Sequence, residues 1–151
     1  MSKIEIAVEV KSPADKFWGA IKESTKLFPE IFPEQYKSIE IVEGDGQSVG
    51  SVRLIKYAEG IPIITFSKER VETADEESKS VSYTVIDGDI SNFYKHFKAS
   101  LQVVPKGEGS CVKWSVEYEK ATEEVPEPNL IQEFAVKTFS DLDTYLLNLK
   151  A

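Results

Sequence analysis

The sequence has very few residues of the types that build disulfides and metal sites. Its 151 residues include one cysteine, Cys111, and one histidine, His96. A lone cysteine cannot form a disulfide within the chain, which suits a reducing compartment, so we expect a cytoplasmic protein. Zinc sites need several cysteine or histidine ligands, so we expect no metal. Nothing in the sequence supports a catalytic triad, and we interpret Cys111 as an ordinary small residue.

Clusters of basic residues and long apolar runs are absent as well. The chain has 18 Lys and Arg against 26 Asp and Glu, which gives a formal net charge of −8. Because nucleic acids and anionic membranes are bound through clustered basic residues, the sequence argues against both as partners. No apolar run approaches the roughly 18 residues of a membrane span, and the N-terminus does not have the pattern of a signal peptide. The length suits a single domain over residues 1–151.

The N-terminal part of the chain predicts one strand and two short helices. Residues 4–10 place an apolar side chain at every second position, which predicts a strand with one apolar face. Ser12, followed by a proline and then an acidic residue, is typical of a helix N-cap. A second short helix is predicted over residues 25–32, limited by Pro29 and ended by Pro33.

The middle of the chain predicts a series of short strands, and its C-terminal part predicts a long helix. Strands are expected at 39–42, 51–57, 64–74, 80–86, 93–104 and 111–118, with turns at 61–63, 75–79, 87–89 and 105–109. Short strands joined by short turns favour an antiparallel meander. Residues 129–149 repeat apolar side chains at three- and four-residue steps, which predicts a helix. The element order predicts an α+β fold, with helices on one face of a curved antiparallel sheet.

A glycine-rich loop joins the first two strands of this series. It contains Gly44, Asp45, Gly46 and Gly50, and it continues into the strand at 51–57. A dinucleotide-binding loop has a different glycine spacing and opens a helix, whose N-terminus attracts phosphate. Here no helix follows, and Asp45 adds negative charge where a phosphate would lie. We therefore predict a hairpin loop in which glycine permits tight backbone geometry, not a nucleotide site.

Alternation along each strand predicts which side chains face the helices. The expected inner rows are Arg53, Ile55 and Tyr57; Ile64, Phe66, Lys68 and Arg70; Val81, Tyr83 and Val85; Phe93, Phe97, Ala99, Leu101 and Val103; Val112, Trp114, Val116 and Tyr118; and, on the helix, Ile131, Phe134, Ala135, Thr138 and Leu142. The same alternation places Tyr94, His96 and Lys98 on the outer face. Periodicity alone fits a solid core as well as it fits a ligand cavity.

Charged residues in and near these rows separate into two groups. A buried Arg53 requires an acidic partner or a ligand anion, unless its side chain reaches to the cavity mouth, and the sequence does not identify the partner. The acidic run from Glu69 to Glu77 and a second run from Glu117 to Glu124 are typical of solvated faces and turns. We therefore expect no paired carboxylates within the apolar interior.

Several stretches, in the same order along the chain, resemble one protein superfamily. They read VKSPADKFW, FPEIFPEQYKSIEIVEGDG, SKERVETADEESKSVSYTVIDGDI, VVPKGEGSCVKWSVEYEK and DLDTYLL. They resemble the birch-pollen-allergen and pathogenesis-related superfamily of START-like proteins, and SPADKFW and KWSVEYEK resemble its major latex protein branch. The resemblance implies a helix-grip fold, in which a seven-stranded antiparallel sheet wraps a long C-terminal helix and two short helices close one end. It also implies a large cavity between sheet and helix.

The resemblance implies a monomeric plant protein that binds or carries hydrophobic or amphipathic small molecules in defence or stress, without a cofactor. The alternative is a cofactor-free cyclase or isomerase of a terpenoid, iridoid or alkaloid precursor, with Tyr83 or Arg53 polarising a carbonyl. Relatives that condense alkaloid precursors use an inward lysine, and alternation turns Lys113 outward here. A hormone sensor is a third interpretation, although its gate motifs are absent. The expected ligand-binding residues are Arg53, Ile55, Tyr57, Phe66, Tyr83, Val85, Phe97, Leu101, Trp114, Val116, Tyr118, Phe134 and Thr138.

Overall fold

A computed structural model describes residues 2–61 and 64–149 of the chain, and it has the predicted α+β architecture. The elements, in chain order, are β1 (Ser2–Val10), α1 (Ala14–Lys22), α2 (Ser24–Ile31), β2 (Tyr36–Glu43), β3 (Val52–Tyr57), β4 (Phe66–Asp75), β5 (Ser80–Gly88), α3 (Asp89–Phe93), β6 (Tyr94–Lys106), β7 (Gly109–Lys120) and α4 (Asn129–Asn148). The seven strands form one curved antiparallel sheet in the order β1-β7-β6-β5-β4-β3-β2. The predicted turn at 61–63 includes Pro62 and Ile63, which lie outside the described residues.

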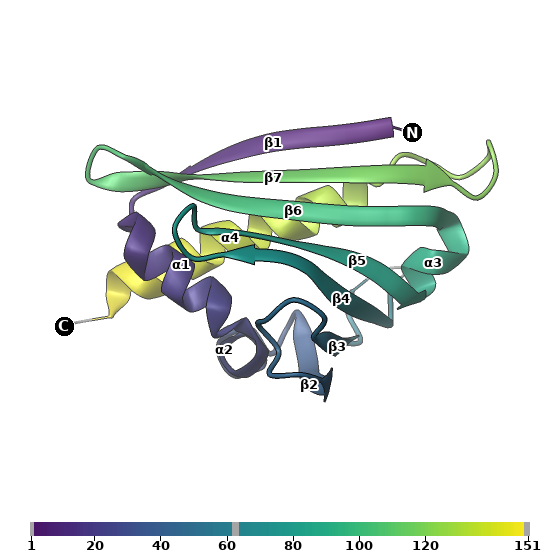
Figure 1. The fold of residues 1–151 in the computed structure, drawn as a ribbon, viewed down its shortest axis with the longest axis horizontal. Coiled ribbons are helices and arrows are strands. Elements are labelled where there is room, and N and C mark those ends of the chain that lie inside the picture. The colour runs from purple at the N-terminus through teal and green to yellow at the C-terminus, as the bar shows by residue number, and fades with distance from the viewer. Residues whose placement is uncertain (1, 62–63, 150–151) are drawn as a thin grey trace.

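Helices α1, α2 and α4 lie on one side of this sheet, and α3 joins the ends of β5 and β6 (Figure 1). Figure 1 shows the 20-residue helix α4 crossing the strands, with α1 and α2 grouped beside β2 and the C-terminal half of α4. The alternating residues of β1 become increasingly buried toward Val10, and β1 pairs along its whole length with β7. Among the described helices, none is both long and apolar enough to cross a membrane.

The first helix begins differently from the prediction, although both short helices are present. Helix α1 starts at Ala14 without a side-chain cap, so the predicted capping role of Ser12 is wrong. Ser12 is buried instead and donates its hydroxyl to Asp143 Oδ1 of α4 at 2.6 Å. This contact, together with two backbone N–H groups bound to the same carboxylate, joins the entry of α1 to α4. Helix α2 contains Pro29 and ends before Pro33, as predicted.

A five-residue helix, α3, stands where the sequence predicted only a turn. The Asp89 carboxylate accepts hydrogen bonds from the Thr65 and Phe66 backbone N–H groups, which fixes the start of this helix against β4. Because α3 extends to Phe93, the strand β6 starts one residue later than predicted and has a register shift near its start. Two predicted orientations are therefore wrong: Phe93 is exposed, and Tyr94 is buried with its hydroxyl donating to the Pro126 carbonyl oxygen.

Solid packing fills the part of the interior next to β1, β6 and β7. Phe17 of α1 and Leu142 of α4 are completely buried there, and the rings of Phe17 and Phe139 lie edge to face with centroids 6.4 Å apart. Val103 and Val112 cover this region from the sheet. Such close packing anchors α1 and α4 to the sheet, and the cavity lies in the remaining part of the interior.

Candidate ligand-binding cavity

A cavity of about 430 Å³ lies between the sheet and the helices. Strands β2 to β7, helices α1, α2 and α4, and the glycine-rich loop all contribute to its wall. Ten of the residues predicted to bind a ligand line it: Arg53, Ile55, Tyr57, Tyr83, Val85, Phe97, Leu101, Trp114, Phe134 and Thr138. The inward direction that strand alternation predicts for these positions of β3, β5, β6 and β7 is confirmed. The volume is in the range of small-molecule sites, about 300–1,000 Å³.

Three of the residues predicted to bind a ligand do not reach the cavity. Val116 and Tyr118 are buried but do not line the cavity, and the Tyr118 hydroxyl donates to the Glu127 carboxylate. Phe66 is half-buried and lies away from the cavity. The proposed contacts of a ligand with these three side chains are therefore not supported by the geometry.

The predicted alternation in β4 is wrong by one residue. Ser67, Glu69 and Val71 face inward, whereas Phe66 does not, and Arg70 lies outside with Glu72 as its ion-pair partner at 3.0 Å. Strand β4 begins only at Phe66, so Ile64 and Thr65 precede it and the phase counted from Ile64 does not continue into the strand. The consequence is chemical, because the inward row carries a carboxylate that the prediction had assigned to solvent.

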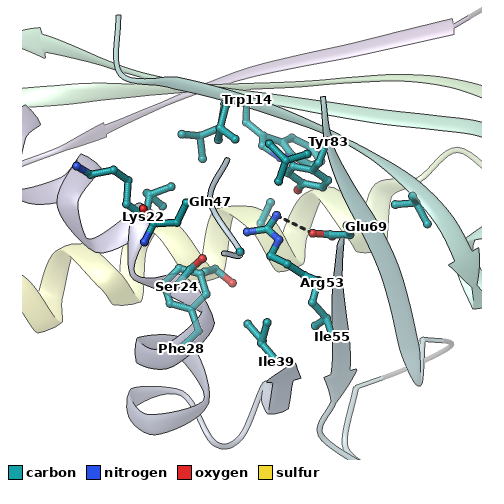
Figure 2. Close-up of a pocket in the computed structure, with 18 of the residues that line it drawn as sticks. Lys22, Ser24, Phe28, Ile39, Gln47, Arg53, Ile55, Glu69, Tyr83 and Trp114 are labelled. Atoms are coloured by element: carbon teal, nitrogen blue, oxygen red, sulfur yellow. Dashed lines mark hydrogen bonds and ion pairs between the residues drawn. The ribbon is translucent and has the colours of Figure 1, made fainter. Parts of the chain in front are cut away.

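Arg53 and Glu69 form a buried ion pair in the cavity wall. They are direct partners in the register of β3 and β4, and Arg53 Nη2 donates to Glu69 Oε1 at 3.0 Å. The exposed fractions of the two side chains are 14% and 9%. Figure 2 shows both side chains pointing toward each other below Tyr83 and Trp114. Glu69 is thus the partner of Arg53 that the sequence did not identify, and its expected place in a solvated run is wrong.

The environment of this pair raises the pKa of several neighbouring groups. Burial raises the pKa of Glu69 above that of an ordinary glutamate, and the Arg53 guanidinium acts in the opposite direction. Burial likewise raises the pKa of the Tyr83 and Tyr57 phenols, so both remain neutral hydrogen-bond donors at neutral pH. The Arg53 guanidinium carbon lies 5.6 Å from the centre of the Tyr83 ring, within cation–π distance.

A second polar group lies on the side of the cavity formed by β2 and α4. The hydroxyls of Tyr36 and Thr138 are 3.1 Å apart, and Gln35 donates its side-chain amide to Thr138 Oγ1 at 3.4 Å. Thr138 was predicted as a cavity residue, whereas Tyr36 and Gln35 were missed. The sequence around them does not alternate in a way that indicates which side chains face inward. It lies between the end of α2 and the start of β2, where the pairing of β2 with β3 has a register shift.

Helix α1 and the glycine-rich loop enclose another side of the cavity. Trp18 and Lys22 of α1 both bind the Glu76 carboxylate, at 3.1 Å from Trp18 Nε1 and 2.7 Å from Lys22 Nζ. Lys22 and Gln47 of the loop both line the cavity, and both are labelled in Figure 2. These contacts were not predicted, since Glu76 stands in an acidic run that was expected to face solvent.

In the glycine-rich loop between β2 and β3, backbone N–H groups form hydrogen bonds within the loop itself. Gly44, Gly46 and Gly50 all have positive φ angles, of 77°, 87° and 89°. The Asp45 carboxylate accepts hydrogen bonds from the backbone N–H groups of Gln47 and Ser48, at 2.9 and 2.7 Å. These bonds hold the pKa of Asp45 far below its usual value. A phosphate would meet this carboxylate instead of free N–H groups, which agrees with the predicted hairpin role.

The remaining candidates for chemistry lie outside the cavity. His96 and Cys111 are half-buried residues that do not line it, and Lys113 is exposed on the outer face of β7. The outward direction predicted for Lys113 is confirmed. Within residues 2–61 and 64–149, no group of three or more His, Cys, Asp or Glu side chains is arranged to hold a metal ion.

Comparison with known sequences gives one family and a set of plant relatives. The pattern of the Pathogenesis-related protein Bet v 1 family matches residues 1–149. The chain is 49% identical to MLP-like protein 423 of Arabidopsis thaliana over 144 residues, which cover 95% of this chain and 93% of the relative. It is 37% identical to major latex protein 146 of Papaver somniferum over 131 residues, 85% of this chain and 80% of that one.

Solved structures show the same fold. The crystal structure of ginseng major latex-like protein 151 from Panax ginseng superposes with a TM-score of 0.87 at 29% identity, covering 95% of this chain and 96% of the other. Norcoclaurine synthase from Thalictrum flavum, in complex with dopamine and hydroxybenzaldehyde, superposes with a TM-score of 0.81 at 24% identity, over 99% and 88% of the two chains. At that identity the second likeness supports the fold only.

Proposed function

We propose that this chain, which belongs to the major latex protein branch of the pathogenesis-related protein Bet v 1 family, binds and carries hydrophobic or amphipathic small molecules. The observation that carries the proposal is the cavity of about 430 Å³ between the sheet and α4. Transfer of apolar ligand surface from water into such a cavity is favourable by roughly 25 cal/mol per Å² before the costs of ordering. The chain acts as a monomer in this proposal.

The distribution of polar groups supports an amphipathic ligand. Most wall residues are aliphatic or aromatic, while two separate polar positions, Arg53 with Glu69 and Tyr36 with Thr138, interrupt the wall. A few polar groups in an apolar wall orient a ligand without preventing its release. The single cysteine favours a cytosolic place of action, and the description of the family as pathogenesis-related supports a role in defence or stress.

Native mass spectrometry with a matched pair of variants tests this carrier function. Val85 is buried and lines the cavity, whereas its neighbour Ile86 is 39% exposed on the opposite face of β5. The protein is incubated with a plant lipid extract, desalted and examined for non-covalent adducts. We expect a one-to-one adduct in the wild type and in Ile86→Phe, and its loss in Val85→Phe, whose added ring occupies the cavity. No adduct, or equal adducts in both variants, contradicts the proposal.

The second candidate function is a cofactor-free cyclase or isomerase, which the polar cluster at one side of the cavity favours. Arg53 and the neutral phenol of Tyr83 are hydrogen-bond donors that can polarise a ligand carbonyl, and the walls can hold one conformer of a reactive precursor. An isomerisation or cyclisation of this kind needs no redox partner. The test is the product ratio formed from a reactive terpenoid dialdehyde with and without protein. A ratio changed by the wild type and restored by Tyr83→Phe supports this function, and an unchanged ratio contradicts it.

A further inference from the structure

The buried ion pair in the cavity wall keeps unused hydrogen-bonding capacity. Arg53 carries five N–H donors, and its side chain makes one hydrogen bond within the described residues, from Nη2 to Glu69 Oε1. Its Nε is buried and has no hydrogen-bond partner in the described part of the chain. The Glu69 carboxylate has about four acceptor sites, of which this bond uses one. Donors and acceptors therefore lie side by side at one position of an otherwise apolar wall.

The charge of the pair restricts which ligand can use this capacity. Arginine and an ionised glutamate sum to zero, so the wall carries no net charge at this position. A ligand anion next to Arg53 would stand beside the Glu69 carboxylate in surroundings that screen charge poorly, and the repulsion would oppose its binding. A neutral ligand meets no such penalty, provided that its polar atoms form hydrogen bonds when they lose water.

The geometry points to a ligand that presents an acceptor and a donor on neighbouring atoms. Arg53 Nη2 and Glu69 Oε1 are 3.0 Å apart, because β3 and β4 hold the two residues directly opposite each other. The ring of Tyr83 lies against the guanidinium, which limits the number of positions that the arginine adopts. A ligand that has only an acceptor forms a hydrogen bond with Arg53 but none with the Glu69 carboxylate.

We propose that Arg53 and Glu69 together recognise neutral amphipathic ligands that carry a carbonyl next to a hydroxyl, the α-hydroxy ketone being the simplest form. The guanidinium donates to the ligand carbonyl, and the ligand hydroxyl donates to the Glu69 carboxylate. The apolar body of the ligand then lies against the aliphatic and aromatic wall. This inference rests on the carrier function proposed above and assigns a ligand class to the same cavity.

Three probes with the same naphthalene body test the inference. They are 2-hydroxy-1-(naphthalen-2-yl)ethanone, which has the carbonyl and the hydroxyl, 1-(naphthalen-2-yl)ethanone, which lacks the hydroxyl, and the anion 2-naphthoate. Affinities are measured by isothermal titration calorimetry on the wild-type protein. Because a hydrogen bond to a charged group contributes about 1.5–3 kcal/mol, the hydroxy ketone should bind about tenfold or more tightly than the simple ketone. The anion should bind more weakly than both.

Two double variants separate the buried pair from ion pairs in general. Arg53→Met with Glu69→Leu replaces the pair by apolar side chains, and its fold is checked by circular dichroism. We expect it to bind the simple ketone and to lose the preference for the hydroxy ketone, to about twofold or less. Arg70→Met with Glu72→Leu removes an ion pair of the same 3.0 Å length within β4 whose residues do not line the cavity, and this variant should keep the full preference.

The outcomes distinguish this inference from the carrier function. If the simple ketone and the hydroxy ketone bind the wild type equally, or if 2-naphthoate binds best, the recognition by Arg53 and Glu69 is wrong while the carrier function stands. If none of the three probes binds, both are wrong. The comparison within the wild type decides the matter even if the double variant of the buried pair does not fold, and Glu69→Gln then replaces that variant, with a weakened preference expected.

Discussion

The hydroxyls of Tyr36 and Thr138 lie 3.1 Å apart across the cavity wall, although 102 residues separate them in the chain. This contact joins β2 to α4. Thr138→Val keeps the shape of the side chain and removes the partner of the buried Tyr36 hydroxyl, so we expect the free energy of unfolding to fall by about 1–3 kcal/mol. Urea denaturation measures the change.

Tyr36→Phe provides the comparison for this contact. It removes the phenol hydroxyl itself, and Thr138 keeps its hydrogen bond to the Phe134 carbonyl oxygen at 3.0 Å, so the loss should be smaller, about 1 kcal/mol. A larger loss in Tyr36→Phe than in Thr138→Val would show that the hydroxyl pair does not act as described.

The raised pKa of Glu69 predicts a specific pH dependence of stability. Burial, opposed by Arg53, raises the pKa of Glu69 in the folded state above that of the unfolded chain. Between these two values the folded protein binds more protons, so this contribution to stability is complete below the unfolded pKa and declines as pH rises through the folded pKa. The stability of the wild type relative to Glu69→Gln should therefore fall as pH rises from about 4 toward neutrality.

Glu72, also on β4, is a control whose contribution to stability should change with pH in the opposite direction. Its hydrogen bond to Arg70 lowers the pKa of Glu72, so its contribution is present above the unfolded pKa and is lost as pH falls through the folded pKa. Urea unfolding of the wild type, Glu69→Gln and Glu72→Gln at several pH values measures both trends. The interpretation of Glu69 fails if its stability difference rises with pH in the way expected for Glu72.

Replacement by alanine should change the free energy of unfolding in opposite directions at two glycines. Gly88 ends β5 with φ of 111°, and a Cβ there would lie 2.3 Å from the Phe66 carbonyl oxygen, a backbone atom that cannot move aside. Gly88→Ala should therefore reduce the free energy of unfolding by about 3 kcal/mol or more. Gly19 lies inside α1, and apart from its chain neighbours and the helix's own backbone no atom of the described residues lies within 4 Å of an added Cβ. Gly19→Ala should therefore increase the free energy of unfolding by about 0.5–1 kcal/mol.

Thermal and urea unfolding of both glycine variants check this prediction. A tolerated Gly88→Ala would mean that the junction of β5 and α3 differs from the described one. A destabilising Gly19→Ala would mean that the apparent space beside α1 is filled in solution.

Asp143 should stabilise the junction between α4 and the start of α1. It accepts hydrogen bonds from the backbone N–H groups of Lys11 and Ser12 and from the Ser12 hydroxyl. Asp143→Ala leaves three donors without their acceptor, and we expect a loss of about 2 kcal/mol in unfolding free energy. The control is Asp141→Ala on the same helix, which removes only an ion pair with exposed Lys137 and should cost less than about 0.5 kcal/mol.

Much of the cavity wall could be predicted because strand alternation is simple where a strand has no bulge. The inner row of β7 is an example, since Val112, Trp114 and Val116 keep the phase that their spacing predicts. The long helix α4 was equally clear, because its apolar residues repeat over five turns. The resemblance to a family supplied the cavity itself, which periodicity does not distinguish from a packed core.

The chemistry of the site could not be predicted in the same way. Glu69 stands at the start of an acidic run, and only the register of β3 and β4 brings it opposite Arg53, which is 16 residues earlier. The alternation counted for β4 was wrong from the start of the strand. The start of β6 was also wrong, because α3 precedes it, and the start of α3 at Asp89 depends on hydrogen bonds with residues distant in the sequence. Local sequence patterns do not contain such contacts.

The central claim is that the cavity beside α4 accepts an apolar ligand, and fluorescence tests it most directly. Both tryptophans of the chain, Trp18 and Trp114, line the cavity, so Trp18→Phe leaves Trp114 as the single reporter. Titration of this variant with 1-(naphthalen-2-yl)ethanone should give a saturable one-to-one change in fluorescence. The change should vanish when Val85→Phe is added and persist with Ile86→Phe. A non-saturating decrease, equal to that of free N-acetyltryptophanamide, would contradict the claim.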